Sequence, residues 1–265
     1  MKIHEMTVAT EEIITCDGYL NFCKERGICY IKTDFFYFGP INWRGSAHPS
    51  KIEDICVIGH SDYPVTDAIT RNFKKSFCIN KQGTNPNSFG IPLGITNDCD
   101  DSPIHRIYGN KEIMVEVMEM QIFKENLAYM NFNISNYPIE RQLVHDLFSN
   151  EKWTKNGIID NTIEGRKRFL MDIKSSKFVF CPRGNGVETT RMWEALYMGS
   201  IPIVKIDRAH ELFTDLPILF IDDWRKVNER FLIDKYEEMK NREYNMEKLN
   251  LSYWTGFIEK KISEK

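Results

Sequence analysis

Cationic side chains and glycines gather in one short stretch in the second half of the chain. Arg183 precedes a Gly-Asn-Gly sequence that ends at Gly186, and Arg191 follows five residues later. Glycines let a backbone approach a ligand closely, and arginines neutralise phosphate charge. Glu194 lies three residues after Arg191, so the two side chains share a face if this segment is a helix. Such a group is suited to a diphosphate, with the carboxylate placed to take the hydroxyls of a ribose or a sugar.

This stretch needs a strand before it and a helix after it to hold the charged groups in place. Residues 177–181 and 201–206 are apolar runs that predict buried strands, and residues 189–198 predict the helix between them. Thr189 or Thr190 can cap that helix, whose N-terminal end attracts anions. The spacing alone also fits a surface loop whose helix carries an internal salt bridge between its arginine and its glutamate.

The rest of the chain alternates short apolar runs with helical patterns, which predicts an α/β fold with parallel sheets. In the first half we expect strands at 27–32, 54–59, 76–80 and 88–95, and helical pieces at 65–73 and 111–123. In the second half we expect strands at 126–133 and 217–221, helices at 138–148 and 164–175, and a helix-rich segment at 228–261. The chain then divides into two Rossmann-like, doubly wound domains, residues 1–122 and 123–265, that face a cleft.

Composition excludes several classes of protein. The 265 residues carry a net charge of -3, so wholesale nucleic-acid binding is not expected, because a phosphate backbone calls for a basic surface. Seven cysteines without a Cys-x-x-Cys pair are interpreted as buried thiols in a reducing compartment. No apolar run is long enough for a membrane span, and no N-terminal signal segment is evident, so we expect a soluble, cytoplasmic protein.

The motif at residues 176–204 resembles a known family. Its sequence Phe-Val-Phe-Cys-Pro-Arg-Gly-Asn-Gly, continued by Thr-Arg-Met-Trp-Glu-Ala-Leu and by Gly-Ser-Ile-Pro-Ile-Val, resembles the donor-site signature of exostosin-type glycosyltransferases. The resemblance implies a GT-B fold, with a nucleotide sugar held mainly by the second domain, and an inverting, metal-independent transfer that requires no cofactor. A compact chain of this kind is similar to the soluble members of chloroviruses and bacteria.

The resemblance also sets the expected partners and the donor-binding residues. The donor is a nucleotide sugar, most often linked to UDP in this family, with UDP-xylose as the first choice. The acceptor is an oligosaccharide or the glycan of a glycoprotein, such as an N-glycan. The residues that we assign to donor binding are Arg183, Gly184, Asn185, Gly186, Thr189, Thr190, Arg191, Glu194, Asn133 and Arg141. Of these, Arg141 also fits a solvated position on its helix, and that is the interpretation we prefer.

An inverting transfer needs a base that deprotonates the acceptor hydroxyl, and in a two-domain cleft it comes from the first domain. His60 and Asp62 follow the predicted strand at 54–59, so they lie at the carboxyl end of that strand. We expect Asp62 to be the base, with His60 as the second candidate. For acceptor binding we assign Trp43, Arg44 and Tyr63, although a tryptophan in a loop can equally fill a core.

Two further interpretations compete with a glycosyltransferase. The Gly-Asn-Gly sequence could bind a dinucleotide in an NAD(P)-dependent oxidoreductase, but the third glycine of that motif would fall at Thr189. A sugar-binding protein without catalysis would need no diphosphate site. The aspartates of residues 98–101 resemble a metal-binding Asp-x-Asp, but loops of this composition are usually turns, so we expect no metal site.

Overall fold

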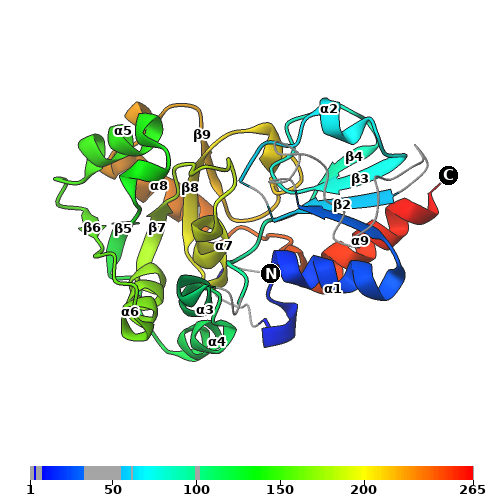
Figure 1. The fold of residues 1–265 in the computed structure, drawn as a ribbon. Coiled ribbons are helices and arrows are strands. Elements are labelled where there is room, and N and C mark those ends of the chain that lie inside the picture. Colours follow the sequence, from blue (N-terminus) through cyan, green and yellow to red (C-terminus); the bar gives the residue numbers. More distant parts are fainter. Residues whose placement is uncertain (1–2, 4–7, 33–54, 61, 99–101, 265) are drawn as a thin grey trace.

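The computed structural model describes residues 3, 8–32, 55–60, 62–98 and 102–264, which form two α/β units side by side (Figure 1). Each unit contains one sheet in which all paired strands are parallel. The α/β class and the two parallel sheets predicted from the sequence are therefore confirmed.

The first sheet has the strand order β1-β2-β3-β4. Its strands are β1 (Cys29–Lys32), β2 (Ile55–Gly59), β3 (Lys75–Cys78) and β4 (Ser88–Gly90). The accompanying helices are η1 (Thr10–Glu12), α1 (Cys16–Arg26) and the four-residue α2 (Asp67–Thr70). The described strands follow one another across the sheet in chain order, so the reversal of a doubly wound sheet is not seen in this part of the first unit.

The second sheet has the strand order β6-β5-β7-β8-β9. Its strands are β5 (Asn126–Met130), β6 (Thr154–Asn156), β7 (Ser176–Phe180), β8 (Ile201–Lys205) and β9 (Leu219–Ile221). Because β6 and β7 lie on opposite sides of β5, the winding reverses at β5, as predicted for a doubly wound sheet. Ligands of such sheets bind beyond the carboxyl ends of the strands at this reversal.

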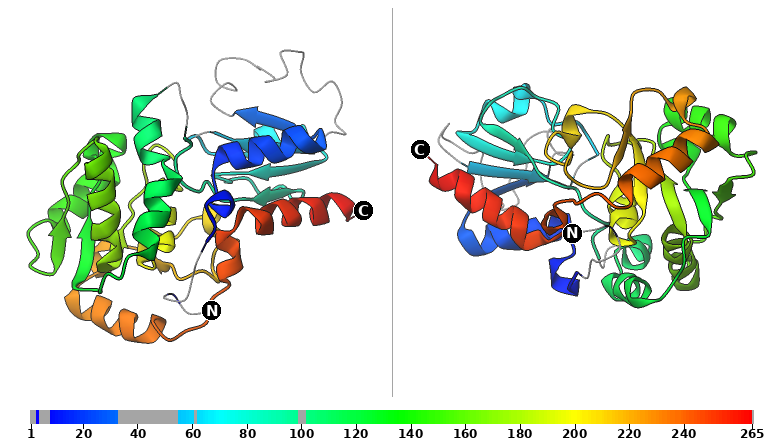
Figure 2. Two further views of the ribbon diagram at one scale, coloured as in Figure 1. Left: turned by 90° about the horizontal axis from the view of Figure 1, so that it is seen from below. Right: turned by 180° about the vertical axis from the view of Figure 1, so that it is seen from behind.

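Helices cover both faces of the second sheet (Figures 1 and 2). The α-helices are α3 (Pro103–Tyr108), α4 (Lys111–Glu119), α5 (Pro138–Phe148), α6 (Ile163–Lys174), α7 (Thr190–Tyr197) and α8 (Glu229–Met239). The short 3-10 turns are η3 (Ile134–Asn136), η4 (Arg208–His210), η5 (Trp224–Lys226) and η6 (Met246–Leu249). Pro138 opens α5, where its missing N–H costs no hydrogen bond.

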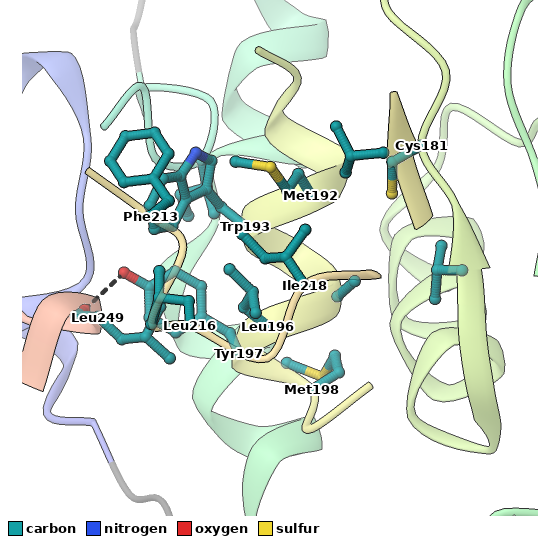
Figure 3. Close-up of a cluster of buried hydrophobic side chains, with 14 of the residues drawn as sticks. Cys181, Met192, Trp193, Leu196, Tyr197, Met198, Phe213, Leu216, Ile218 and Leu249 are labelled. Atoms are coloured by element: carbon teal, nitrogen blue, oxygen red, sulfur yellow. Dashed lines mark hydrogen bonds between the residues drawn. The ribbon is translucent and has the colours of Figure 1, made fainter. Parts of the chain in front are cut away.

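The helix α7 lies within a cluster of buried hydrophobic side chains, which Figure 3 shows. Every residue from Met192 to Tyr197 is buried, and Trp193 packs edge to face against Phe213. The hydroxyl of Tyr197 donates a hydrogen bond to the carbonyl of Leu249 and accepts one from the backbone N–H of Ile14. Because its buried face is fixed on several sides, α7 presents its N-terminal turn in a defined position.

The C-terminal helix packs on the first unit, whereas the predicted domain division assigned it to the second. The helix α9 (Leu251–Ser263) runs beside α1 on the first unit (Figure 2). The ring of Phe257 packs edge to face against Phe77 of β3 and Phe89 of β4, and Glu259 pairs with Arg26 of α1 at 2.8 Å. The first sheet is apolar and needs a cover, and α9 supplies it.

The domain boundary predicted near residue 122 also does not match the way in which the helices pack. The helices α3 and α4 precede it in sequence, yet both pack on α6 of the second unit. Lys174 of α6 donates hydrogen bonds to the last carbonyls of α4, at Val117 and Met118. The chain therefore passes from the first unit to the second before α3, and it returns to the first unit at α9.

Candidate functional site

A pocket of about 390 Å³ opens beyond the carboxyl end of β5, next to the N-terminal turn of α7. This is the place where the winding of the second sheet reverses. Its walls come from α3, from the segments that follow β5 and β6, and from the start of α7. Tyr108 of α3 closes one side, where its hydroxyl donates a hydrogen bond to the side-chain oxygen of Asn161 at 2.9 Å. The pocket contains Thr189, Thr190, Arg191, Glu194, Asn133 and Arg141 of the predicted donor-binding set.

The arginines that line this pocket, among the described residues, are Arg141 and Arg191. The guanidinium of Arg141 donates hydrogen bonds to the backbone carbonyls of Arg183, at 2.8 Å, and of Asn133, at 2.7 Å. Burial and the nearby charge of Arg191 lower the pKa of Arg141 to about 10. Both guanidinium groups lie over the ring of Phe132 in cation–π contacts. Arg141 is 4% exposed, so the interpretation of Arg141 as a solvated helix residue is wrong.

Two polar side-chain atoms at the start of α7 have no hydrogen-bond partner in the part of the chain that the structure describes. The hydroxyl of Thr189 and the Nε of Arg191 are buried and accept or donate no hydrogen bond among the described residues. The predicted cap is not formed, since Thr189 occupies the N-cap position of α7 without a side-chain cap bond. Unpaired buried polar groups are uncommon in folded proteins, and a bound ligand is one way in which they are satisfied. The N-terminal turn of α7 thus has both the dipole and the donors of an anion site.

Glu194 lines the same pocket, and its carboxylate is bonded to an arginine that is not part of the pocket lining. Its carboxylate forms a buried salt bridge at 2.5 Å with Arg166 of α6, and the two side chains are 3% and 0% exposed. The alternative pairing of Glu194 with Arg191 is not observed. The guanidinium of Arg166 also lies over the rings of Tyr108 and Phe169. Arg166 was not predicted from the sequence, because nothing near it in the chain indicates a partner 28 residues away.

Arg183 is not in this pocket. Its guanidinium stacks on the ring of Tyr137 at 4.3 Å and lines a separate pocket of about 200 Å³ between α5 and the end of β8. A side chain at Gly184 would come within 2.8 Å of the Nη2 of Arg141, so the glycine makes room for that guanidinium. The pair of cations predicted as Arg183 with Arg191 is therefore Arg141 with Arg191 in the structure.

Residues of the first unit contact the glycine loop, residues 183–186. The side chain of Asn185 donates a hydrogen bond to the carboxylate of Asp62 at 3.2 Å. A Cβ on Gly186 would lie 3.1 Å from the carbonyl oxygen of Asp62, so this glycine permits a close approach of the two backbones. Asp62 is exposed, and Tyr63 beside it is 43% exposed. The structure thus brings the predicted base next to the predicted donor loop.

His60 is held on both sides of its ring. Its Nδ1 lies 2.6 Å from the hydroxyl of Tyr30, and its Nε2 lies 2.9 Å from the carboxylate of Asp17 at the start of α1. Its backbone has a φ of 54°, which a residue with a side chain adopts rarely. With both nitrogens bonded, His60 has no ring atom ready to take a proton from an acceptor, whereas the carboxylate of Asp62 is exposed to solvent. Of the two candidates for the predicted base, Asp62 therefore has the more accessible side chain.

Glu188 is a further residue of the loop that the sequence analysis did not select. It is 2% exposed, and burial raises its pKa to about 8. Its carboxyl accepts hydrogen bonds from the backbone N–H of Leu93 in the first unit and from the indole N–H of Trp193 in α7. A glutamate directly before a helix usually indicates a helix start, so only the partner from the first unit reveals its different role.

Some predicted features fall outside the described residues. Trp43 and Arg44, assigned to acceptor binding, lie in the undescribed range 33–54, and residues 99–101 include most of the aspartate cluster. Within the described residues, no group of three or more histidines, cysteines or carboxylates is arranged to hold a metal ion. In the same part of the chain, no helix is both long enough and apolar enough to cross a bilayer.

The second half of the chain is similar to a known family. Residues 139–265 match the model of the RXYLT1 C-terminal domain, a xylosyltransferase family. Among solved structures, the chain is similar to a crystal structure of alpha1,3-fucosyltransferase with GDP-fucose, at 13% sequence identity and a TM-score of 0.41, over 82% of this chain and 80% of that chain. No curated protein sequence matches the chain. The segment that carries the glycine loop, Arg141 and Arg191 is therefore similar to a family of glycosyltransferases.

Proposed function

We propose that this chain is an inverting glycosyltransferase that binds a nucleotide sugar in the 390 Å³ pocket and transfers the sugar to a hydroxyl of a glycan. The observation that carries the proposal is the pair Arg141 and Arg191 beside the N-terminal turn of α7. Two buried or half-buried cations next to each other, with unpaired donors around them, call for a multiply charged anion. The diphosphate of a nucleotide sugar is such an anion.

Each part of the donor has a matching part of the pocket. The diphosphate lies between Arg141, Arg191 and the first N–H groups of α7, which also stabilise the charge that develops on the leaving group. The carboxylate of Glu194, fixed by Arg166, takes hydroxyls of the ribose or of the sugar. Tyr108 with the apolar residues around it, at the far wall, forms the surface for the nucleobase. The positive charge comes from the protein itself, so we expect transfer to proceed in the presence of a chelator.

Asp62 is the proposed base. It belongs to the first unit, contacts Asn185 of the donor loop and lies close enough to influence the pKa of Arg141. An inverting transfer requires the acceptor hydroxyl to lose its proton as it attacks from the side opposite the leaving group. A carboxylate of the first unit beside the loop that precedes the proposed diphosphate site meets that requirement. Asp62→Asn is expected to lower the transfer rate by a factor on the order of 100 or more, while UDP binding is retained.

The similarity to a xylosyltransferase family supports UDP-xylose as the first donor to test. We propose a glycan as the acceptor, and an N-glycan is one of the candidates. Transfer assays with UDP-xylose, UDP-galactose, UDP-glucuronic acid and UDP-N-acetylglucosamine compare the sugars, and release of free UDP reports donor hydrolysis when no suitable acceptor is present.

Binding of UDP, GDP and NAD, measured by calorimetry, tests the site directly. Loss of one charged hydrogen bond to phosphate costs about 2 kcal/mol, so Arg191→Ala and Arg141→Ala are each expected to weaken UDP binding about 30-fold. Arg183→Ala is a matched control, because it removes an arginine of the same loop that faces a different pocket. Equal losses in Arg183→Ala and Arg191→Ala would contradict the assignment of the pocket, and binding of NAD alone would favour an oxidoreductase.

A further inference from the structure

Glu188, in loop 184–188, forms two hydrogen bonds with the first unit and a third with α7 of the second unit. Its backbone N–H donates to the side-chain oxygen of Asn80, which follows β3, at 2.8 Å. Its Oε1 accepts hydrogen bonds from the backbone N–H of Leu93, after β4, and from the indole N–H of Trp193 in α7. The Glu188 side chain therefore links the loop at Leu93 to the helix whose N-terminal turn lines the donor pocket, and its backbone N–H adds a bond to the loop at Asn80.

The contact around Glu188 is closely fitted. Asn80 has a φ of 48°, and its side-chain amide lies where a Cβ on Gly186 would come within 2.9 Å. A non-glycine residue adopts this backbone conformation only where the surrounding structure holds it. The glycine loop, Glu188 and the first unit are thus fixed against one another at the point where the two units meet.

We propose that Glu188 is a positioning residue that holds the phosphate-binding turn of α7 in register with the first unit, and that it does so as a neutral carboxylic acid. This inference rests on the proposed function, because the turn that it positions is the proposed diphosphate site. Glu188 itself does not line the donor pocket, so it acts through the loop and through Trp193.

The surroundings of Glu188 explain why the carboxyl is neutral. Among the described residues, its buried Oε2 has no hydrogen-bond partner and no cation lowers its pKa. The titratable groups that face it are Cys16 and Tyr19 of α1, and both have raised pKa values of their own because of burial. Leu93, Asn80 and Trp193, on the other elements packed against it, carry no charge. Burial raises the pKa of Glu188 to about 8, so the protonated form predominates at pH 7.

Ionisation of Glu188 would place an unpaired charge at the junction of the two units, and the contact would loosen. If UDP binding requires the neutral form, affinity falls with the fraction of that form. With a pKa of about 8, about one molecule in 30 keeps the proton at pH 9.5, so wild-type affinity for UDP should fall about 30-fold between pH 7 and pH 9.5.

Glu188→Gln keeps the acceptor oxygen and cannot ionise, so it is the informative variant. We expect it to bind UDP like the wild type at pH 7 and to lose the decline above pH 8. Glu188→Ala should bind UDP weakly at every pH. The proposal is overturned if Glu188→Gln shows the wild-type decline, or if it has already lost UDP affinity at pH 7. Should Glu188→Ala fail to fold, the comparison of Glu188→Gln with the wild type still decides.

A second measurement separates this proposal from the proposed function. Hydrogen exchange of the Leu93 amide and of loop 184–188 requires no ligand. We expect protection at pH 7 in the wild type and in Glu188→Gln, and faster exchange in Glu188→Ala and in the wild type at pH 9.5 after correction for the intrinsic rate. Unchanged protection in the alanine variant would refute the positioning role. If the wild type fails to bind UDP but shows this exchange pattern, the nucleotide assignment is wrong and the role of Glu188 in the junction stands.

Discussion

Gly184→Ala tests the geometry of the donor pocket with a single methyl group. The added Cβ would lie 2.8 Å from the Nη2 of Arg141, well inside the roughly 3.5 Å at which non-bonded atoms make favourable contact. Gly184 does not have a positive φ, so alanine can adopt its backbone conformation and the effect is steric. Arg141 cannot simply turn away, because its hydrogen bonds to the carbonyls of Arg183 and Asn133 hold the guanidinium in place.

The expected cost is about one of these two charged hydrogen bonds, or about 2 kcal/mol, which corresponds to about 30-fold weaker UDP binding by calorimetry. Gly256→Ala is the matched control, since a Cβ there meets nothing within 4 Å; it should leave UDP affinity unchanged and stabilise α9 by about 0.5–1 kcal/mol. A double-mutant cycle gives the sharper test. If Gly184→Ala acts by displacing Arg141, it has no further effect on UDP binding in an Arg141→Ala background. An undiminished loss in that background, or wild-type affinity in Gly184→Ala alone, would refute the reasoning.

Three other predictions concern the parts that support the site. His210 is 1% exposed, and neither of its ring nitrogens has a hydrogen-bond partner among the described residues. Burial lowers the pKa of His210 to about 4, so the unfolded chain takes up a proton at a higher pH than the folded protein does. The free energy of unfolding should therefore fall by about 1.4 kcal/mol per pH unit as the pH drops from 6.5 to 4. Urea unfolding should show that His210→Phe lacks this decline, and an identical slope in both proteins would contradict it. Arg166→Met should leave Glu194 buried and unpaired, which weakens UDP binding and costs about 3 kcal/mol of stability, whereas Arg166→Met combined with Glu194→Gln should recover the stability but not the binding. Phe257→Ala should lower the stability of the first unit by about 3 kcal/mol in urea unfolding, and a loss confined to the second unit would show that α9 is wrongly placed.

Local sequence patterns predicted the elements around the donor loop closely. The helix expected at 138–148 is α5, and the strand, loop, helix and strand expected from 177 to 206 are β7, α7 and β8 within one or two residues. These elements are set by short apolar runs and by a proline at a helix start, signals that need no distant partner. The helix α1 was not predicted, because a glycine interrupts its pattern; that glycine makes room for the side chain of Leu251 of α9.

The directions of side chains could not be read from the same patterns. Arg183 and Arg191 flank the glycines, so the sequence pairs them, yet Arg183 turns to the ring of Tyr137. Arg141 enters from another helix, because Gly184 leaves a space that only the folded chain defines. The buried salt bridge of Arg166 with Glu194 likewise depends on how α6 packs on α7. Spacing shows which residues share an element, and packing decides which of them face one pocket.

The segment that matches the family model, residues 139–265, does not coincide with a structural unit. It begins inside α5 and so omits β5, the strand that joins β6 to the rest of the second sheet. It also includes α9, whose apolar face covers the first sheet. The donor loop depends on the missing part as well, because Asn80 and Leu93 bond Glu188 and Asp62 contacts Asn185. The proposed donor site thus draws on both units: the second unit supplies the cations and the N-terminal turn of α7, and the first unit contacts the loop that precedes this turn.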